Sequence, residues 1–111
     1  MEKITDYRTC IMQLLRQFGD AIPSSEHVEI QYIFDTQRDH YQLFQVGWEG
    51  YDWIHGCILH LDIRNGKIWI QHNGTELSIA DELVAMGVPK QDIVLGFQAP
   101  YKRKYTGFAE N

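Results

Sequence analysis

The sequence predicts a single α+β domain, in which a four-stranded antiparallel meander sheet carries an N-terminal helix and a C-terminal helix on one face. Three observations lead to this class. Apolar residues recur at helical spacing over residues 2–18 and 76–86, whereas the residues between them form β-type runs. Asn65-Gly66 marks a tight hairpin within those runs. A chain of 111 residues without repeats or linkers has room for one domain, residues 1–111.

Residues 2–18 are predicted to form an amphipathic helix. Its apolar positions lie three or four residues apart and are Ile4, Tyr7, Ile11, Leu14, Leu15 and Phe18. Gly19 is a favourable residue just beyond a helix end, and Pro23 cannot continue the helix. We therefore expect the helix to end near Phe18.

Two strands are predicted next, over residues 28–34 and 41–48. Both segments are rich in β-branched and aromatic side chains. The polar residues 35–40 between them suit a hairpin loop. Gly47 and Gly50 permit a bend or bulge before the third strand begins near Trp53.

The hairpin at Asn65-Gly66 determines the expected register of the third and fourth strands. Asn-Gly readily adopts the two positive φ angles of a type I′ turn. The opposed pairs are then Ile63 with Ile68, Asp62 with Trp69, Leu61 with Ile70, and His60 with Gln71. Strict alternation places one set of side chains in the core: Cys57, Leu59, Leu61, Ile63, Ile68 and Ile70. The opposite, polar face carries Ile58, His60, Asp62, Arg64, Lys67, Trp69 and Gln71.

The C-terminal third is predicted to contain a helix over residues 76–86, with either Thr75 or Ser78 as its N-cap. Gly87 ends this helix, and residues 89–92 suit a single helical turn that begins with proline. The apolar run 93–97 is either a short strand or a continuation of that turn. Periodicity does not separate the two for so short a segment.

Charge and cysteine content restrict the function classes. The net charge of −5 repels polyanions, which argues against DNA binding by the surface as a whole. The N-terminus lacks a signal-like pattern, and no apolar run approaches the about 20 residues that span a bilayer, so we expect a cytoplasmic protein. Cys10 and Cys57 are expected to be reduced, buried thiols.

The histidines near the hairpin suggest a metal site, but the expected register opposes it. His60 and Asp62 share the polar face, whereas His72 points to the other face. His55 has the parity of His72 but lies about 13 Å further along its strand. A bulge at Gly56 would reverse this parity.

No catalytic signature accompanies these histidines. The sequence contains neither a nucleophile motif nor a phosphate-binding glycine loop. We therefore expect no metal, no cofactor and no enzymatic activity. If the chain were an enzyme, His60 and Asp62 would be its acid–base pair.

The polar face leaves Trp69 among hydrophilic neighbours. A partner chain would cover it, since interfaces are enriched in aromatic residues. The alternative is that the C-terminal tail folds over it. The candidate partner-binding residues are His60, Asp62, Trp69 and Gln71.

The tail, residues 100–109, interleaves basic and aromatic side chains. This pattern can follow a nucleic-acid strand through charge and stacking. The candidates for contact with nucleic acid or with a partner are Lys102, Arg103, Lys104 and Tyr105. On an acidic chain the favoured alternative has the aromatic rings folded against the domain and the lysines in solvent.

Several strings run in order along nearly the whole chain. They include Phe34-Asp-Thr-x-Arg-Asp-x-Tyr-Gln-Leu43, Val46-Gly-Trp48, His60-Leu-Asp-Ile-x-Asn-Gly-Lys-Ile-Trp-Ile-Gln71, Gly87-Val-Pro-Lys90, Asp92-Ile-Val-Leu-Gly-Phe97 and Tyr105-Thr-Gly-Phe-Ala109, where x is any residue. Together these strings resemble the XisI family of cyanobacteria.

The resemblance implies a controlling factor in the excision of the fdxN element, a DNA segment removed during heterocyst differentiation. It places the chain beside a separate recombinase and a second factor, XisH. We therefore expect a regulatory role through binding to an XisH-like protein. Direct DNA contact through the tail is the alternative, and self-association stays open.

Overall fold

The computed structural model describes residues 3–23 and 25–111, with side chains from residue 6 onward, so the predicted core position Ile4 lies outside the described side chains. The elements in chain order are α1 (Lys3–Ala21), β1 (Val28–Asp35), β2 (His40–Glu49), β3 (Asp52–Arg64), β4 (Lys67–Asn73), α2 (Ile79–Ala85), the 3-10 helix η1 (Lys90–Asp92), β5 (Ile93–Leu95) and the 3-10 helix η2 (Pro100–Tyr105).

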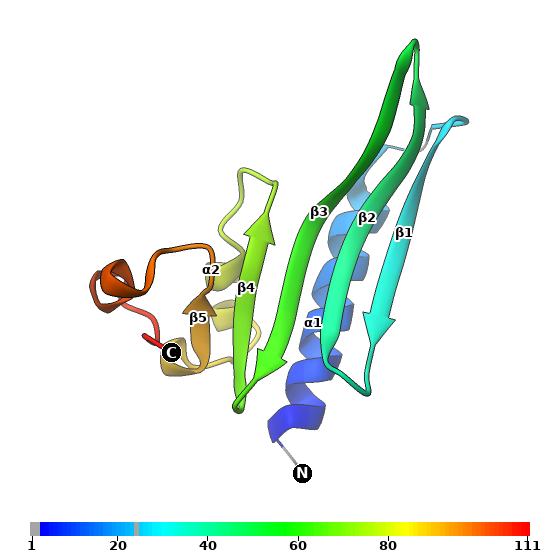
Figure 1. Ribbon diagram of the computed structural model, residues 1–111. Helices are drawn as coiled ribbons and strands as arrows, with labels where there is room; N and C mark the ends of the chain where they lie inside the picture. The colour runs from blue at the N-terminus through cyan, green and yellow to red at the C-terminus, as the bar shows by residue number, and fades with distance from the viewer. Residues whose placement is uncertain (1–2, 24) are drawn as a thin grey trace.

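The sheet has five strands in the order β1-β2-β3-β4-β5 (Figure 1). The first four form the predicted antiparallel meander. Strand β5 then pairs with β4 in parallel, so the sheet is mixed, and the prediction of only four strands is wrong. A parallel neighbour requires a long crossover connection, which α2 and η1 provide. Residues 93–95 thus adopt the strand alternative.

Both α-helices pack on one face of the sheet, as predicted. Helix α1 lies behind β1, β2 and β3, and α2 lies behind β4 (Figure 1). The residues that they enclose with the sheet are fully buried and include Ile11, Leu14, Leu15, Tyr41, Leu43, Leu59, Leu61, Ile68, Ile70, Ile79, Leu83 and Ile93. This core fixes which face of the sheet remains for other contacts.

The helix boundaries differ from the predicted ones. Helix α1 continues past Gly19 to Ala21. The Tyr32 ring packs against Gly19, where a Cβ atom would lie 2.4 Å from the Tyr32 hydroxyl oxygen, so a glycine is needed inside the last turn. Helix α2 begins only at Ile79, because Ser78 is the N-cap and its hydroxyl oxygen accepts a hydrogen bond from the Asp81 amide.

The β3–β4 hairpin confirms the predicted turn and the three pairs nearest to it. Asn65 and Gly66 have φ angles of 53° and 75°, as a type I′ turn requires. Beyond Leu61 a bulge shifts the register, and His60 pairs with His72. The predicted pairing of His60 with Gln71 is therefore wrong. His72 shares the polar side with His60 instead of facing the core.

A second bulge interrupts the pairing of β2 with β3. Leu43 pairs with Leu59, but the next residue, Phe44, pairs with Cys57, so Ile58 is the extra residue. Directly paired side chains share a face, and Cys57 therefore lies beside Phe44 on the face away from the helices. Ile58 packs against the core. The predicted faces of Cys57 and Ile58 are thus reversed.

The loop between β1 and β2 holds α1 against the sheet. Asp39 accepts hydrogen bonds from Arg8 Nε (2.7 Å), Arg8 Nη2 (3.1 Å) and the Tyr41 hydroxyl (2.8 Å). Hydrogen bonding to Arg8, opposed in part by burial, lowers the pKa of the Asp39 carboxyl group. Asp39 has a φ of 60°, a conformation that aspartate tolerates better than most residues. This contact fixes the start of β2, where His40 follows.

We expect Asp39→Ala to lower the free energy of unfolding at neutral pH by about 2 kcal/mol, because the Arg8 guanidinium and the buried Tyr41 hydroxyl lose their acceptor. Since the folded pKa of Asp39 is depressed, its stabilisation is present above the pKa of an unfolded aspartate. It is lost as the pH falls through the lower, folded pKa. Urea unfolding followed by circular dichroism at pH 7 and at about pH 3 measures both effects.

The matched control is Asp52→Ala, which removes an exposed carboxylate and should change the stability by less than about 0.5 kcal/mol. Acid reduces the stability of any chain with several carboxylates, so the difference between Asp39→Ala and the wild type is the informative quantity. That difference should shrink at low pH. A difference that is independent of pH would contradict the assignment.

Candidate histidine–aspartate site

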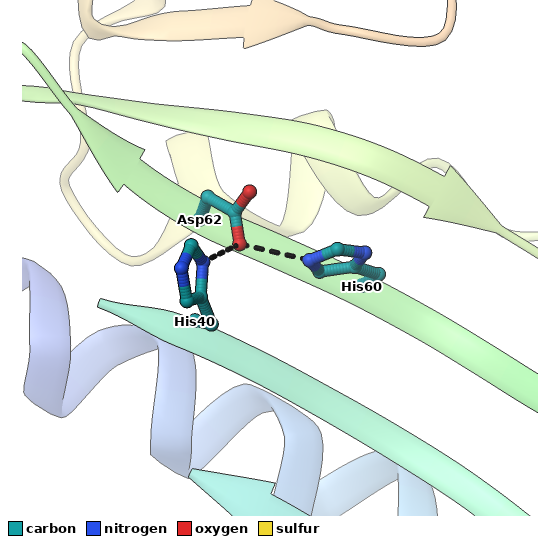
Figure 2. Close-up of side chains that lie close together, drawn as sticks. All are labelled: His40, His60 and Asp62. Atoms are coloured by element: carbon teal, nitrogen blue, oxygen red, sulfur yellow. Dashed lines mark hydrogen bonds and ion pairs between the residues drawn. The ribbon is translucent and has the colours of Figure 1, made fainter. Parts of the chain in front are cut away.

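A cluster of two histidines and one aspartate lies on the sheet face opposite the α-helices. His40, the first residue of β2, pairs directly with Asp62 of β3. Figure 2 shows both imidazole rings directed at one carboxylate. His40 Nδ1 lies 2.9 Å and His60 Nε2 lies 2.8 Å from the same atom, Asp62 Oδ1.

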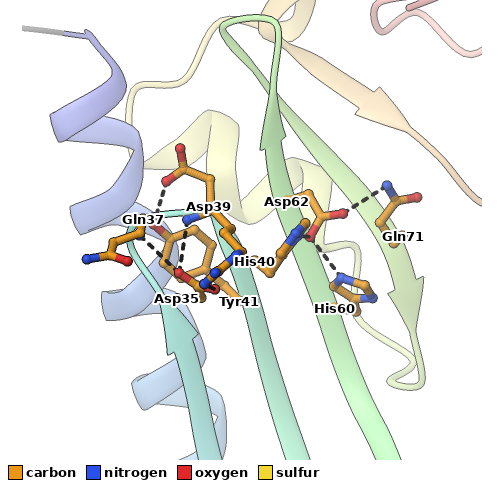
Figure 3. A network of polar contacts seen from close by, with 9 residues as sticks. Asp35, Gln37, Asp39, His40, Tyr41, His60, Asp62 and Gln71 are labelled. Carbon is orange, nitrogen blue, oxygen red and sulfur yellow. Dashed lines mark hydrogen bonds and ion pairs between the residues drawn. The ribbon is translucent and has the colours of Figure 1, made fainter.

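Asp62 is the one charged residue that is buried among the described residues, with 5% of its surface exposed. Its second oxygen, Oδ2, accepts a hydrogen bond of 3.2 Å from the Gln71 side-chain amide (Figure 3). Burial by itself would raise the pKa of this carboxyl group. The hydrogen bonds from His40, His60 and Gln71, with the attraction of His60, outweigh burial and hold the pKa below its usual value.

Gln71 reaches Asp62 because of the β3–β4 bulge. The bulge leaves Gln71 without a directly paired residue on β3. On its other side the amide lies against Gly96, where a Cβ atom would be only 2.4 Å from Gln71 Oε1. The absence of a side chain at Gly96 therefore leaves the space that the Gln71 amide occupies.

The C-terminal segment covers Trp69, which is 8% exposed and forms a small apolar cluster with Val94 and Ala109. The Arg64 and Arg103 guanidinium groups lie 4.9 Å and 5.1 Å from the centre of the Trp69 ring. The tail, one of the two predicted coverings, thus lies over this residue. Trp69 is not an exposed contact in the described chain.

The four predicted contact residues of the tail differ in role. Arg103 donates to the carbonyl oxygens of Gln98 (3.1 Å) and Gly96 (3.3 Å), so its guanidinium ties η2 to the end of β5. Lys102 and Lys104 are exposed, and their ammonium groups lie over the rings of the neighbouring tyrosines, Tyr101 and Tyr105. Arg103 is therefore a structural residue, whereas Lys102, Lys104 and Tyr105 are on the surface.

His40 is not among the site residues predicted from the sequence, because residues 35–40 were expected to form a loop and the predicted register came from the β3–β4 hairpin alone. The sequence feature that could have identified His40 is the β2–β3 hairpin, because residue pairs counted along both strands from its corner at Glu49 and Asp52 extend as far as His40. That count also needs the bulge at Ile58, without which His40 would oppose Leu61.

A second surface also went unnoticed, which we call the aromatic arm, residues 48–53. The pairing of β1 begins at Val28 opposite Gly47, so the arm extends beyond β1 at the tip of the β2–β3 hairpin (Figure 1). The Trp48 and Trp53 rings are 5.3 Å apart, and both are about half exposed, at 53% and 54%. Tyr51 between them is fully exposed.

The chemistry of the cluster is that of proton or cation binding. Two imidazole nitrogens and a buried carboxylate oxygen converge from adjacent strands.

Burial raises the pKa of the thiols of Cys10 and Cys57, so neither is an activated nucleophile. In the described part of the chain no helix is long and apolar enough to cross a bilayer.

Fold and site together define a small α+β protein whose mixed sheet carries helices on one face and a histidine–aspartate cluster on the other. The family model described as "XisI protein" matches residues 1–110. The chain therefore belongs to the XisI family.

Two solved structures from Anabaena variabilis ATCC 29413 are similar to it. A XisI-like protein has 48% sequence identity and a TM-score of 0.92, with 96% of this chain and 97% of that chain covered. The fdxN element excision controlling factor XisI has 40% identity and a TM-score of 0.84, with 99% and 100% covered. A comparison with curated proteins finds no match.

We expect Arg103→Met to lower the free energy of unfolding by about 1 to 2 kcal/mol, because the guanidinium loses the Trp69 ring and two carbonyl acceptors. Lys102→Met and Lys104→Met are the matched controls. They should each change the stability by less than about 0.5 kcal/mol. Urea unfolding of the three variants measures the difference, and equal effects would contradict the structural role of Arg103.

Proposed function

We propose that this chain is a regulatory accessory factor that acts by binding a protein partner, an XisH-like protein, and that it does not catalyse a reaction. Membership of the XisI family supports the regulatory part, since one relative is named an excision controlling factor. The observation that carries the binding part is the exposure of Trp48, Tyr51 and Trp53 at the tip of the aromatic arm.

Three exposed aromatic side chains on one hairpin tip favour a protein partner. Aromatic residues are enriched in protein interfaces, where they form the main anchors, and exposed apolar patches on soluble proteins mark interaction sites. The arm projects beyond β1, so a groove on the partner can enclose both of its faces. Its acidic residues, Glu49 and Asp52, together with the net charge of −5, disfavour a nucleic acid at this surface.

The arm is a better candidate than the polar-face residues predicted from the sequence. Asp62 and Trp69 are buried, so a partner at that face would meet His60 and Gln71 but neither of the other two. We therefore place the proposed partner contact on the arm and keep the polar face as the comparison surface.

We expect the double substitution Trp48→Ala and Trp53→Ala to weaken binding to the cognate XisH-like protein at least about tenfold, because two aromatic anchors are lost. Co-purification of the untagged chain with its tagged partner detects the loss, and titration calorimetry measures it. The matched control is Tyr101→Ala with Tyr105→Ala, which removes two exposed rings elsewhere on the surface.

Four outcomes of this experiment are informative. Loss with the arm variant and retention with the tail control support the proposal. Equal binding by all variants places the contact elsewhere, and loss with His60→Ala alone returns it to the polar face. The absence of any binding by the wild type would overturn the partner proposal altogether. Circular dichroism of each variant verifies that it is folded.

Direct contact with DNA is the second candidate, favoured by one observation. Lys102, Lys104, Tyr101 and Tyr105 are exposed together on η2 and combine charge with stacking surfaces. Arg103 contributes less, because its guanidinium is already bonded within the domain.

If the tail contacts DNA, Lys102→Met with Lys104→Met should weaken binding to element-end DNA and reduce the slope of log K against log salt by about 2, one per phosphate contact. Fluorescence anisotropy over a range of salt concentrations measures this slope. The arm variant is the control and should bind DNA as the wild type does. Binding that is absent, or whose slope does not change, would exclude the tail as a DNA contact.

A further inference from the structure

We propose that His40, His60 and Asp62 form a binding site for a divalent transition-metal ion of the zinc class. Nothing in the proposed regulatory role requires such a site, so this inference stands apart from partner binding. It rests on the geometry of three donor groups, on their chemical identity and on the residues that hold them.

The three donor groups are close enough to share one ion. Their ligand atoms all lie within 4.8 Å of one another. Both imidazole nitrogens are 2.8–2.9 Å from Asp62 Oδ1, whereas ligands around a tetrahedral zinc ion, bound at about 2.0 to 2.1 Å, are about 3.3 Å apart. An ion therefore needs each nitrogen to move slightly away from Oδ1, while the two nitrogens, which lie within 4.8 Å of each other, come to the spacing of zinc ligands by rotation of the imidazole side chains.

The donor set selects the class of ion. Two imidazole nitrogens and one carboxylate oxygen suit zinc, cobalt(II) and iron(II), and this combination is used by metal sites that keep open coordination positions. Magnesium and calcium prefer oxygen ligands and would gain little from the two imidazole groups. Imidazole binds a metal in its neutral form, so in the metal-binding form of the site the Asp62 carboxylate supplies a negative charge that favours a cation.

The scaffold holds the donors in place. His40 and Asp62 occupy paired positions on β2 and β3, and His60 lies two residues before Asp62 on the same strand. The Gln71 amide donates to Asp62 Oδ2 and so orients the carboxylate with Oδ1 towards both rings (Figure 3). Such outer contacts are typical of protein metal sites and fix the ligand orientation.

One side of the cluster faces solvent. Asp62 is buried at the base, whereas His40 is exposed and His60 is intermediate. An ion can therefore enter from the side of His40, and the coordination positions not filled by the three residues remain for water or for an external donor. A site of this kind binds metal reversibly without unfolding of the domain.

The competing account is a cluster held by hydrogen bonds alone. In that case His40 Nδ1 and His60 Nε2 each carry a proton that they donate to Asp62 Oδ1. The two accounts differ in a measurable way, because only a metal site takes up one ion per chain. As the ion binds, the proton on each ligating nitrogen shifts to the other nitrogen of a neutral ring, or is released to solvent from an imidazolium.

The test uses the untagged chain of 111 residues after treatment with a chelator. Titration calorimetry with zinc chloride measures the stoichiometry and affinity, and cobalt chloride supplies a visible absorption spectrum that reports nitrogen and oxygen ligation. We expect one ion per chain. Removal of an outer-shell partner alone typically weakens metal affinity about 10- to 100-fold, so His40→Ala or His60→Ala should each weaken it by more than about 100-fold.

The matched controls are His27→Ala and His55→Ala, which remove exposed imidazoles that lie outside the cluster and are not paired with its members. They should bind zinc and cobalt as the wild type does. Zinc should also raise the unfolding temperature of the wild type and of both controls, but not that of His40→Ala or His60→Ala.

Several results would overturn the proposal. One is the absence of binding by the wild-type chain at millimolar zinc, and another is unchanged affinity in both cluster variants. Loss of binding in His55→Ala, with retention in His40→Ala, would place the ion elsewhere on the sheet. If a cluster variant does not fold, Asp62→Asn, which keeps the size of the side chain, replaces it, and an affinity equal to that of the wild type would count against the site. Partner binding through the arm is measured separately, so the two proposals can fail independently.

Discussion

The pairing register of β3 determines which side chains form the core and which form the histidine–aspartate cluster. This strand pairs with β2 on one side and β4 on the other, and each pairing contains one bulge. An unbroken register from the β2–β3 corner, where Glu49 pairs with Asp52, would place Leu61 opposite His40. The extra residue at Ile58 shifts β3 by one position, so that Asp62 lies opposite His40 and shares its face. A single inserted residue in β3 thus determines whether His40 meets an apolar side chain or a carboxylate.

The burial of Asp62 connects that register to the C-terminal part of the fold. A carboxylate removed from water is tolerated only when its oxygens are hydrogen-bonded. Histidines from two strands donate hydrogen bonds to Asp62 Oδ1, and the side-chain amide of Gln71, left unpaired by the second bulge, donates to Oδ2. Gly96 leaves room for that amide, and the segment after β5 covers the neighbouring Trp69. The fifth strand and the tail therefore complete the surroundings of the cluster as well as the sheet.

Features determined by local chemistry could be predicted from the sequence. The Asn65-Gly66 turn specifies its own conformation, amphipathic spacing identifies α1 and α2, and a serine before acidic residues marks a helix start. The bulges could not be predicted, because they arise where packing on both sides of β3 must be satisfied together. His40 entered the site only through one of them. Strand β5 was ambiguous because its pairing with β4 is a contact between segments far apart in the chain.

The two surfaces that carry the functional proposals lie at opposite ends of β3. Trp53 is near its start and Asp62 near its end, so at the usual rise they are separated by up to about 30 Å. A partner that encloses the aromatic arm would leave the histidine–aspartate cluster accessible. The arm is also less restrained than the cluster. Near Asp62, β3 pairs with both β2 and β4, and β1 pairs with the other edge of β2. Around Trp53, β3 pairs with β2 alone. A hairpin tip of this kind can adjust to a partner, whereas a site built on paired strands holds fixed donor positions. The division suits a protein that recognises another chain with one end and binds a small ion or proton with the other.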